Sequence, residues 1–408
     1  MSLETTLPTG LSAAGVEPGF HATVLRPTVE ARGLPNAAYT SEAFLDFERD
    51  HLLAKTWTAI GSGAEIPQPG DAKPVDILGL PLLLLRDQDH GIKVFHNVCS
   101  HRGMQLVSAP CNVGKVIRCP YHSWVYSQEG DLRVAPLIGG PGKNDCPGFD
   151  KARHGLKPVR TAVWFDQVFV NVSGDAPPFE AWIAPLAERW KDFDGSLLRH
   201  GGPDSSLLFE LDCNWKLAVE NYCEAYHLPW VHPGLNSYSR IEDHYNIELE
   251  DCFAGQGTTV YAPNQPVDGP GFPRFPDLPV VWDKQAEYVA LFPNILLGIH
   301  NDHLFVMRLE PLAPGRTREQ VEIYYVGDEP LGEAYAERRR ANAEAWRSVF
   351  LEDVGVVEGM QRGRASPAFK GGVFSPVMDT PTHCFHRWVA ANAGAALENG
   401  AARLKVAG

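Results

Sequence analysis

The sequence predicts an α+β protein with a small all-β domain followed by a larger domain that mixes strands with long helices. Its 408 residues exceed what one ordinary hydrophobic core needs, so two domains are expected. Short apolar runs separated by Gly, Pro and Asp fill residues 65–172, as in an all-β domain. From residue 173 onward, strand-like runs stand between long helical patterns, as in an α+β domain.

Charge and cysteine usage limit the classes of function. The net charge is −14, from 36 basic and 50 acidic residues, and no Lys or Arg cluster offers a nucleic-acid face. This charge suits a cationic substrate, although plain solubility explains it too. No run is long and apolar enough to span a membrane, and no signal sequence is visible. The eight Cys lack a disulfide-like rhythm, which is typical of a cytoplasmic protein.

The N-terminal residues divide into two predicted segments. Residues 1–38 are rich in Pro, Gly, Thr and Ala, and we expect a loosely ordered or draping arm. Within residues 39–64, apolar residues recur at helical spacing over 39–61, with Ser41 as the N-cap. We expect this helix to pack on the larger domain, which takes residues 173–408.

The remaining elements follow from apolar runs in chain order. The strands of the all-β domain are expected at residues 75–87, 92–98, 115–119, 123–127 and 162–172. In the larger domain we expect a strand, a helix, three further strands and a long helix, at residues 206–215, 216–228, 286–300, 302–312, 319–329 and 331–363. A C-terminal helix is expected near Trp388.

Two Cys and two His alternate in the all-β region. Cys99 and His101 form a CxH pair, and after seventeen intervening residues Cys119 and His122 form a CxxH pair. Zinc is a common holder of two Cys and two His, but a zinc finger expects CxxC followed by two His on a helix. Here each loop contributes one Cys and one His. This arrangement favours a Rieske [2Fe–2S] cluster, in which Cys binds one iron and His the other.

A second His motif lies in the larger domain, in the segment ENYCEAYHLPWVHPG. Glu224 and His227 are three residues apart and would share a helix face. An unbroken helix would splay His227 and His232, but Pro229 disfavours helical geometry at Leu228 and breaks the turn. Two His that converge with one carboxylate form the facial triad of non-haem Fe(II) oxygenases.

The carboxylate of this triad must come from elsewhere in the chain. Asp353, where the long helix meets the Gly-interrupted stretch FLEDVGVVEGMQRG, is the first candidate, and Glu352 and Glu358 are the alternatives. Other candidate pairs are His383 with His386 and Asp243 with His244. For His383 and His386 we expect a hydrogen-bonded wall of the C-terminal helix rather than a metal site.

Together these motifs resemble the α subunit of a Rieske non-haem iron oxygenase, over about residues 40–392. The resemblance implies a helix-grip (START-like) catalytic domain with an antiparallel sheet and long helices. It also implies a cluster site and a mononuclear iron site. Their ligands would be Cys99, His101, Cys119 and His122 for the cluster, and His227, His232 and Asp353 for the single iron.

The acid three residues before His227 points to one branch of this family. Many members carry Asp three residues before the first iron-binding His, and this Asp bridges to a cluster His of the neighbouring subunit. Glu224 stands there instead, as in the carnitine and glycine-betaine oxygenases. The stretches NYCEAYH, LFPNILLG and EDVGVVEGMQRG resemble the same branch. We therefore expect a homotrimer in which Glu224 links His122 of one subunit to His227 of the next.

The resemblance also implies an activity. A separate flavin- or ferredoxin-type NAD(P)H reductase would supply electrons, because no GxGxxG fingerprint is present here. With O₂, the oxygenase would hydroxylate or N-demethylate a small quaternary or N-methylated amine. The alternatives are ring hydroxylation of an aromatic acid and a Rieske electron carrier without catalysis. Six aromatic residues could either present ring faces to a cation or pack in the core: Trp182, Trp230, Tyr261, Trp282, Phe292 and Phe374.

Overall fold

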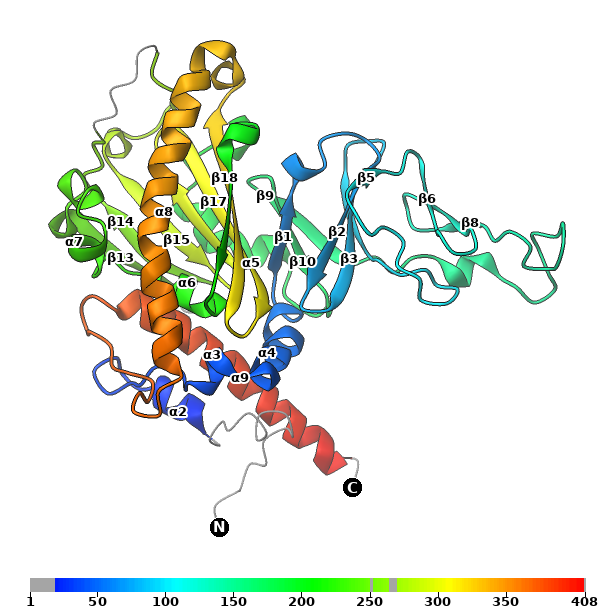
Figure 1. Cartoon of the computed structure of the whole chain (residues 1–408), viewed down its shortest axis with the longest axis horizontal. Coiled ribbons are helices and arrows are strands. Elements are labelled where there is room, and N and C mark those ends of the chain that lie inside the picture. Colours follow the sequence, from blue (N-terminus) through cyan, green and yellow to red (C-terminus); the bar gives the residue numbers. More distant parts are fainter. Residues whose placement is uncertain (1–18, 250–251, 264–269, 407–408) are drawn as a thin grey trace. The chain divides into compact units, whose positions relative to one another are not determined.

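Two units divide the chain, which is drawn in Figure 1. The computed structural model describes residues 19–249, 252–263 and 270–406. Unit 1 combines Met1–Leu53 with Pro177–Gly408, and unit 2 is Ala54–Ala176. No helix in the described ranges is long and apolar enough to cross a membrane.

Unit 2 consists of three antiparallel sheets, in line with its short apolar runs. The first has the order β1 (Thr58–Ser62), β10 (Gln167–Asn171), β9 (Arg160–Trp164). The second has the order β4 (Ile92–His96), β3 (Leu80–Arg86), β2 (Asp71–Ile77), β5 (Cys111–Asn112). The third has the order β6 (Val116–Arg118), β7 (Val125–Ser127), β8 (Leu132–Val134). One buried cluster, which includes Phe95, Ile117 and Trp124, also contains Cys99 and Cys119.

The helix predicted over residues 39–61 is wrong in its second half. Ser41 does cap α4 (Glu42–Glu48), because its side chain accepts the Phe44 N–H at 3.4 Å. A π-helical turn, Arg49–Leu53, then ends the helical segment. Residues 58–62 form β1 instead, because they pair with β10. Residues 54–64 therefore lie in unit 2 rather than with the preceding helix.

Unit 1 is built on one antiparallel sheet of eight strands. Its order is β11 (Leu198–His200), β18 (Arg316–Val326), β17 (His303–Ala313), β16 (Ile295–Ile299), β15 (Ala286–Leu291), β14 (Phe253–Thr258), β13 (His244–Leu249), and β12 (Ser206–Leu211) also pairs with β18. This arrangement agrees with the predicted antiparallel sheet.

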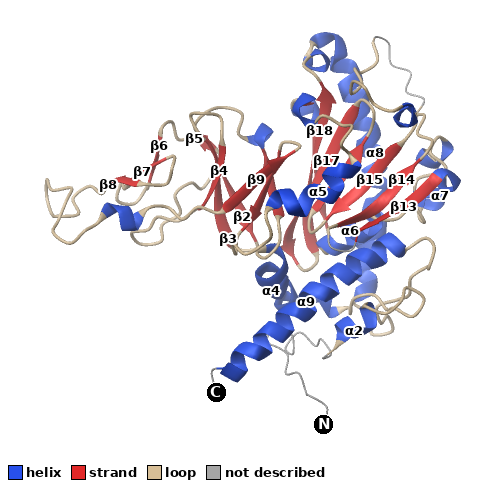
Figure 2. Cartoon of the chain, turned by 180° about the vertical axis from the view of Figure 1, so that it is seen from behind, coloured by secondary structure: helices blue, strands red, loops and turns tan. Residues whose placement is uncertain are grey.

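Helices cover both faces of this sheet. Figure 1 shows α8 in front of the strands, and Figure 2, drawn from behind, shows α5 in front of them. The helices are α2 (Phe20–Val24), α3 (Ala37–Thr40), α4 (Glu42–Glu48), α5 (Phe179–Arg189), α6 (Trp215–Tyr222), α7 (Leu228–Val231), α8 (Ala336–Arg364) and α9 (Thr380–Val406). The long helices α8 and α9 were both predicted.

The described part of the predicted arm packs on unit 1. Helix α2 contacts α9, and Phe20, Val24 and Leu34 are buried. This part is ordered by apolar contact rather than loosely held. Residues 1–18 of the predicted arm lie outside the described residues.

A buried ion pair joins the N-terminal segment to α6. Lys216 Nζ lies 2.7 Å from Glu48 Oε1, and both side chains are 0% exposed. Burial raises the pKa of Glu48 and lowers the pKa of Lys216, although each charge favours the charged form of the other. Neither charge is stable here without its partner.

We expect Lys216→Met to lower the free energy of unfolding by about 3–5 kcal/mol, because it strands the Glu48 carboxylate in the core. The double variant Glu48→Gln, Lys216→Met should regain most of this loss. Scanning calorimetry of the two variants measures both effects. A single variant as stable as the wild type would contradict the role of this pair.

Candidate metal sites

Two matched loops in unit 2 carry the predicted cluster residues. The Cys99 N–H donates to the Met104 carbonyl at 2.8 Å, and the Gly103 N–H returns to the Cys99 carbonyl at 3.0 Å. The second loop repeats both bonds five and four residues after Cys119, with Trp124 and Ser123 as the partners. Gly103 and Ser123 have φ of +72° and +55°, so each loop closes through a left-handed residue.

The loops gather the two sulfurs and the two imidazoles. Cys99 and Cys119 are buried, and the rings of His101 and His122 lie 4.7 Å apart. His122 Nδ1 is buried without a hydrogen-bond partner, which leaves its lone pair free for a metal. Trp124 stacks on His101 at 4.7 Å and fixes the plane of that ring. Burial lowers the pKa of His101, so its imidazole is in the neutral form that binds metals.

These four residues fit a two-iron cluster better than one zinc ion. In the described part of the chain, three ligand atoms within 4.8 Å of one another occur only at His227, His232 and Asp353. Cys99, His101, Cys119 and His122 do not form such a group, whereas tetrahedral zinc needs four ligand atoms around one point. A [2Fe–2S] cluster separates its Cys-bound and His-bound ends, which suits the wider arrangement.

The second site lies in unit 1, where α8 meets the residues at the two ends of α7. His232 Nε2 lies 3.0 Å from Asp353 Oδ1, and His227 Nε2 lies 3.6 Å from the same oxygen. Asn221 at the end of α6 donates to Asp353 Oδ1 at 3.2 Å. Hydrogen bonds and charge from Asp353 and Glu352 outweigh burial and raise the pKa of His232. The three side chains therefore converge on one point that suits a cation.

The backbone reaches this geometry differently from the prediction. Helix α6 ends at Tyr222, so Glu224 and His227 share no helix face. Glu224 instead accepts the backbone N–H groups of Tyr226 and His227, and its Oε1 lies 2.6 Å from His227 Nδ1. Pro229 does not break a helix but lies in the first turn of α7, where a missing N–H costs nothing.

The alternative acids occupy other places on α8. Glu352 Oε2 lies 2.7 Å from His232 Nδ1, the ring nitrogen that faces away from Asp353. Glu358 accepts the backbone N–H of Asp212 at 3.2 Å and contacts neither His. Of the three acids, only Asp353 faces both imidazoles.

The other predicted His pairs bond groups that offer no metal site. His383 bonds the Val24 carbonyl at 2.8 Å, and His386 Nδ1 accepts the Leu34 N–H at 3.1 Å, as expected for a hydrogen-bonded wall. His386 also pairs with the buried Glu220 at 3.1 Å, an acid that the sequence did not point to. His244 bonds Gln256 and Ser239 rather than Asp243.

A cavity of about 490 Å³ borders His227, His232 and Asp353. Gln256, Tyr288 and Phe305 form its strand wall, and they lie in one row of the sheet register with Gly298 between Tyr288 and Phe305. Gly298 is needed there, because a Cβ would lie 2.2 Å from the Phe305 ring. Trp346 and Phe350, two turns and one turn before Asp353 on α8, form the facing wall. The site therefore opens into an aromatic chamber.

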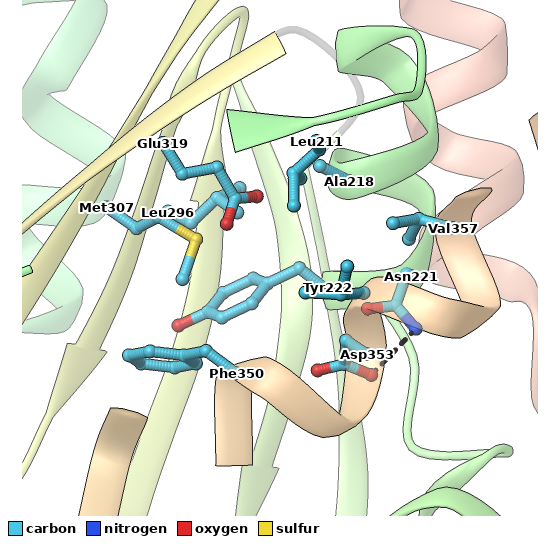
Figure 3. A pocket seen from close by; sticks show the side chains of 11 residues that line it. Leu211, Ala218, Asn221, Tyr222, Leu296, Met307, Glu319, Phe350, Asp353 and Val357 are labelled. Carbon is cyan, nitrogen blue, oxygen red and sulfur yellow. Dashed lines mark hydrogen bonds between the residues drawn. The ribbon is translucent and has the colours of Figure 1, made fainter. Parts of the chain in front are cut away.

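A second cavity, of about 350 Å³, shares Asn221, Tyr222, Phe350 and Asp353 with the first (Figure 3). Figure 3 shows Tyr222 and Asn221 arriving from α6, Phe350 and Asp353 from α8, and Glu319 from a strand. Of the described residues that line the two cavities, none is Lys or Arg. The chamber is thus aromatic and acidic.

The aromatic residues singled out in the sequence do not line either cavity. Trp230 is 71% exposed, and Trp282 and Phe292 are buried in the core. Tyr261 lies one layer behind the wall, stacked on Trp346. Trp182 and Phe374 are also absent from the lining. The lining aromatics were missed because the sheet register and the α8 face, not sequence proximity, bring them together.

Family models match most of the chain. The catalytic domain of the ring hydroxylating alpha subunit matches residues 187–395, and the Rieske [2Fe-2S] domain matches residues 56–141. The carnitine monooxygenase oxygenase subunit of Acinetobacter pittii is 27% identical over 343 residues, covering 83% of this chain and 86% of that protein. The chloroplastic choline monooxygenase of Arabidopsis thaliana is 29% identical over 378 residues, covering 88% and 82%.

The fold is also similar to a solved structure of a quaternary ammonium Rieske monooxygenase. That structure is described as giving insight into carnitine oxidation and inter-subunit electron transfer. The TM-score is 0.75 at 23% identity, with 91% of this chain and 98% of the other covered. This likeness establishes the shared architecture of the two chains.

We expect Asp353→Ala to lose about one of three irons per chain, because it removes the oxygen that faces both imidazoles. The visible spectrum of the cluster should persist, since its ligands lie in the other unit. Iron analysis and absorption spectroscopy measure the two effects. Glu358→Ala is the matched control on the same helix and should keep all iron. If Asp353→Ala retains its iron while Glu352→Ala does not, the acid has been misassigned.

Proposed function

This chain belongs to the family of ring-hydroxylating alpha subunits, and we propose that it oxidises a small quaternary or N-methylated amine at a carbon attached to nitrogen. It is the terminal oxygenase component of a Rieske-type system. The observation that carries the substrate proposal is the aromatic cavity beside His227, His232 and Asp353, whose described lining has no Lys or Arg. The carnitine and choline monooxygenases among the relatives support the same substrate class.

The cofactors of this family are a Rieske [2Fe–2S] cluster and a mononuclear iron. We assign the cluster to Cys99, His101, Cys119 and His122, and the single iron to His227, His232 and Asp353. When bound, the cluster supplies electrons one at a time and the single iron activates O₂.

The residues around the single-iron site orient its ligands. Glu224 holds His227 Nδ1 and Glu352 holds His232 Nδ1, so both Nε2 atoms are left to face Asp353. Such carboxylate–imidazole bonds fix the tautomer and the ring orientation of a ligating His. Asn221 adds a donor to Asp353 and limits how that carboxylate turns.

The cavity suits an amine cation better than an aromatic acid. Tyr222, Tyr288, Phe305, Trp346 and Phe350 give ring faces that attract a cation at about 0.5–2 kcal/mol each. An aromatic carboxylate would want a basic side chain, and the described lining has none. On an N-methyl group, one oxygen atom enters a C–H bond and the other leaves as water with two electrons and two protons. The resulting carbinolamine releases formaldehyde and the demethylated amine.

The partners and assembly extend this proposal. A separate flavin- or ferredoxin-type NAD(P)H reductase would supply the electrons in the cytoplasm. We infer a homotrimer in which the cluster of one subunit passes electrons to the iron of the next. The similar quaternary ammonium Rieske monooxygenase supports this, because its structure gives insight into inter-subunit electron transfer. Glu224, already bonded to His227, would reach His122 of the neighbouring subunit.

Purified oxygenase with a compatible reductase, NADH and O₂ tests the substrate class. We expect choline, carnitine or a related betaine to yield formaldehyde or a hydroxylated amine, because the chamber attracts a cation. Benzoates serve as the competing panel in the same assay. Phenols or cis-diols from the benzoates, with the amines untouched, would overturn the proposal.

We expect Glu224→Gln to slow product formation by about tenfold or more while both metal sites stay filled, because it weakens the bond that orients His227. Iron analysis and turnover are measured together, and light scattering should give a trimer. A monomer with full activity would contradict both the bridge and the assembly.

A further inference from the structure

One buried acid in unit 1 has no assigned role. Glu319 lies on β18 and is 7% exposed. Its register partner, Leu309, belongs to β17, and its side chain points into the smaller cavity with Met307 and Leu296 (Figure 3). Among the described residues, none donates a hydrogen bond to this carboxyl and no cation pairs with it.

An unpaired carboxylate in such a place is costly. Burial, with the charge of Asp353 acting in the same direction, raises the pKa of Glu319 to about 8. Buried charges in folded proteins are normally paired, because the protein interior solvates a charge much less well than water does. The protein supplies no counter-charge here, so a ligand that enters the cavity is the available source of one.

The surroundings of Glu319 select the kind of cation. The Tyr222 and Phe350 rings, together with Met307 and Leu296, form largely apolar walls around Glu319. The other lining groups that could accept an N–H are Asn221, Asp353 and the Tyr222 hydroxyl. A hydrated metal ion or a primary amine could use these few acceptors, but it would lose much of its water shell against the apolar walls. A methylated ammonium has no N–H to satisfy and carries a diffuse charge that aromatic faces and a carboxylate both attract.

We propose that Glu319 is the counter-charge that receives the methylated ammonium head of the substrate, between the Tyr222 and Phe350 rings. This inference rests on the amine-oxidising function proposed above and names the residue that selects the cation. Because the two cavities share Asn221, Tyr222, Phe350 and Asp353, the bound nitrogen would lie next to the metal-binding acid. The carbons attached to that nitrogen would then be the ones presented for oxidation.

Calorimetric titration of the resting holoprotein, without reductase, tests this role apart from turnover. The two probes are choline and its uncharged analogue, in which a tert-butyl group replaces the trimethylammonium group. We expect Glu319→Gln to weaken choline binding by about thirtyfold, the lower end for truncating one partner of a buried charge pair. Binding of the uncharged analogue should change by no more than about threefold, since it makes only van der Waals contacts and no ion pair with residue 319.

Glu322→Gln is the matched control. This residue lies on the same strand and is also buried, but it faces the other side of the sheet, where Ser206 donates to it at 2.7 Å. Its choline affinity should equal that of the wild type. Retained binding of the uncharged analogue shows that Glu319→Gln is folded. If Glu319→Gln does not fold, the wild-type affinities for choline and its uncharged analogue are compared instead. Equal affinities would overturn the proposal, because no positive charge would then be recognised.

The outcomes separate this inference from the function on which it rests. Wild-type protein that binds and oxidises choline, with Glu319→Gln binding it equally well, overturns the role of Glu319 alone. Wild-type protein that binds and oxidises no methylated amine overturns the proposed function and the subsite together.

Discussion

Asp353 is the residue on which the catalytic unit depends, because it alone faces both His227 and His232. It lies on α8, and the two imidazoles lie at the two ends of the short helix α7, so the site exists only where these segments meet. The same crossing places Trp346 and Phe350 of α8 over the inner face of the sheet. One contact thus sets the position of the candidate metal ligands and the shape of the chamber beside them.

The two candidate sites are built in different ways. The cluster loops are local: each is a short turn closed by its own backbone bonds, with its Cys anchored in the core of a small β unit. The second site is assembled from distant parts of the chain and is held by carboxylates behind the imidazoles. Local loops give rigid geometry, which suits a group that only exchanges electrons. A site assembled from several elements leaves room for a substrate, which suits catalysis.

The sequence predicts what is contiguous or periodic. Each pair of cluster residues lies within one short motif, and the apolar periodicity of α8 is strong enough to predict the helix. Tertiary pairing is not visible in that way. Residues 58–62 continue a helical pattern in the sequence, yet they form a strand because they pair with β10. Glu319 and Phe305 reach the cavity walls only through strand register, and no pattern near either residue points to a site. The partner of His386 is Glu220 for the same reason.

The central claim is that His227, His232 and Asp353 hold an iron at the mouth of an amine-binding chamber. Anomalous diffraction at the iron edge, from crystals of the holoprotein grown with choline, tests this most directly. The account predicts one peak bounded by these three side chains, with the ammonium density in the adjoining cavity. It also predicts an elongated two-iron peak between the Cys99 and Cys119 loops. A single peak at the loops that appears only at the zinc edge, or an iron peak away from Asp353, would contradict it.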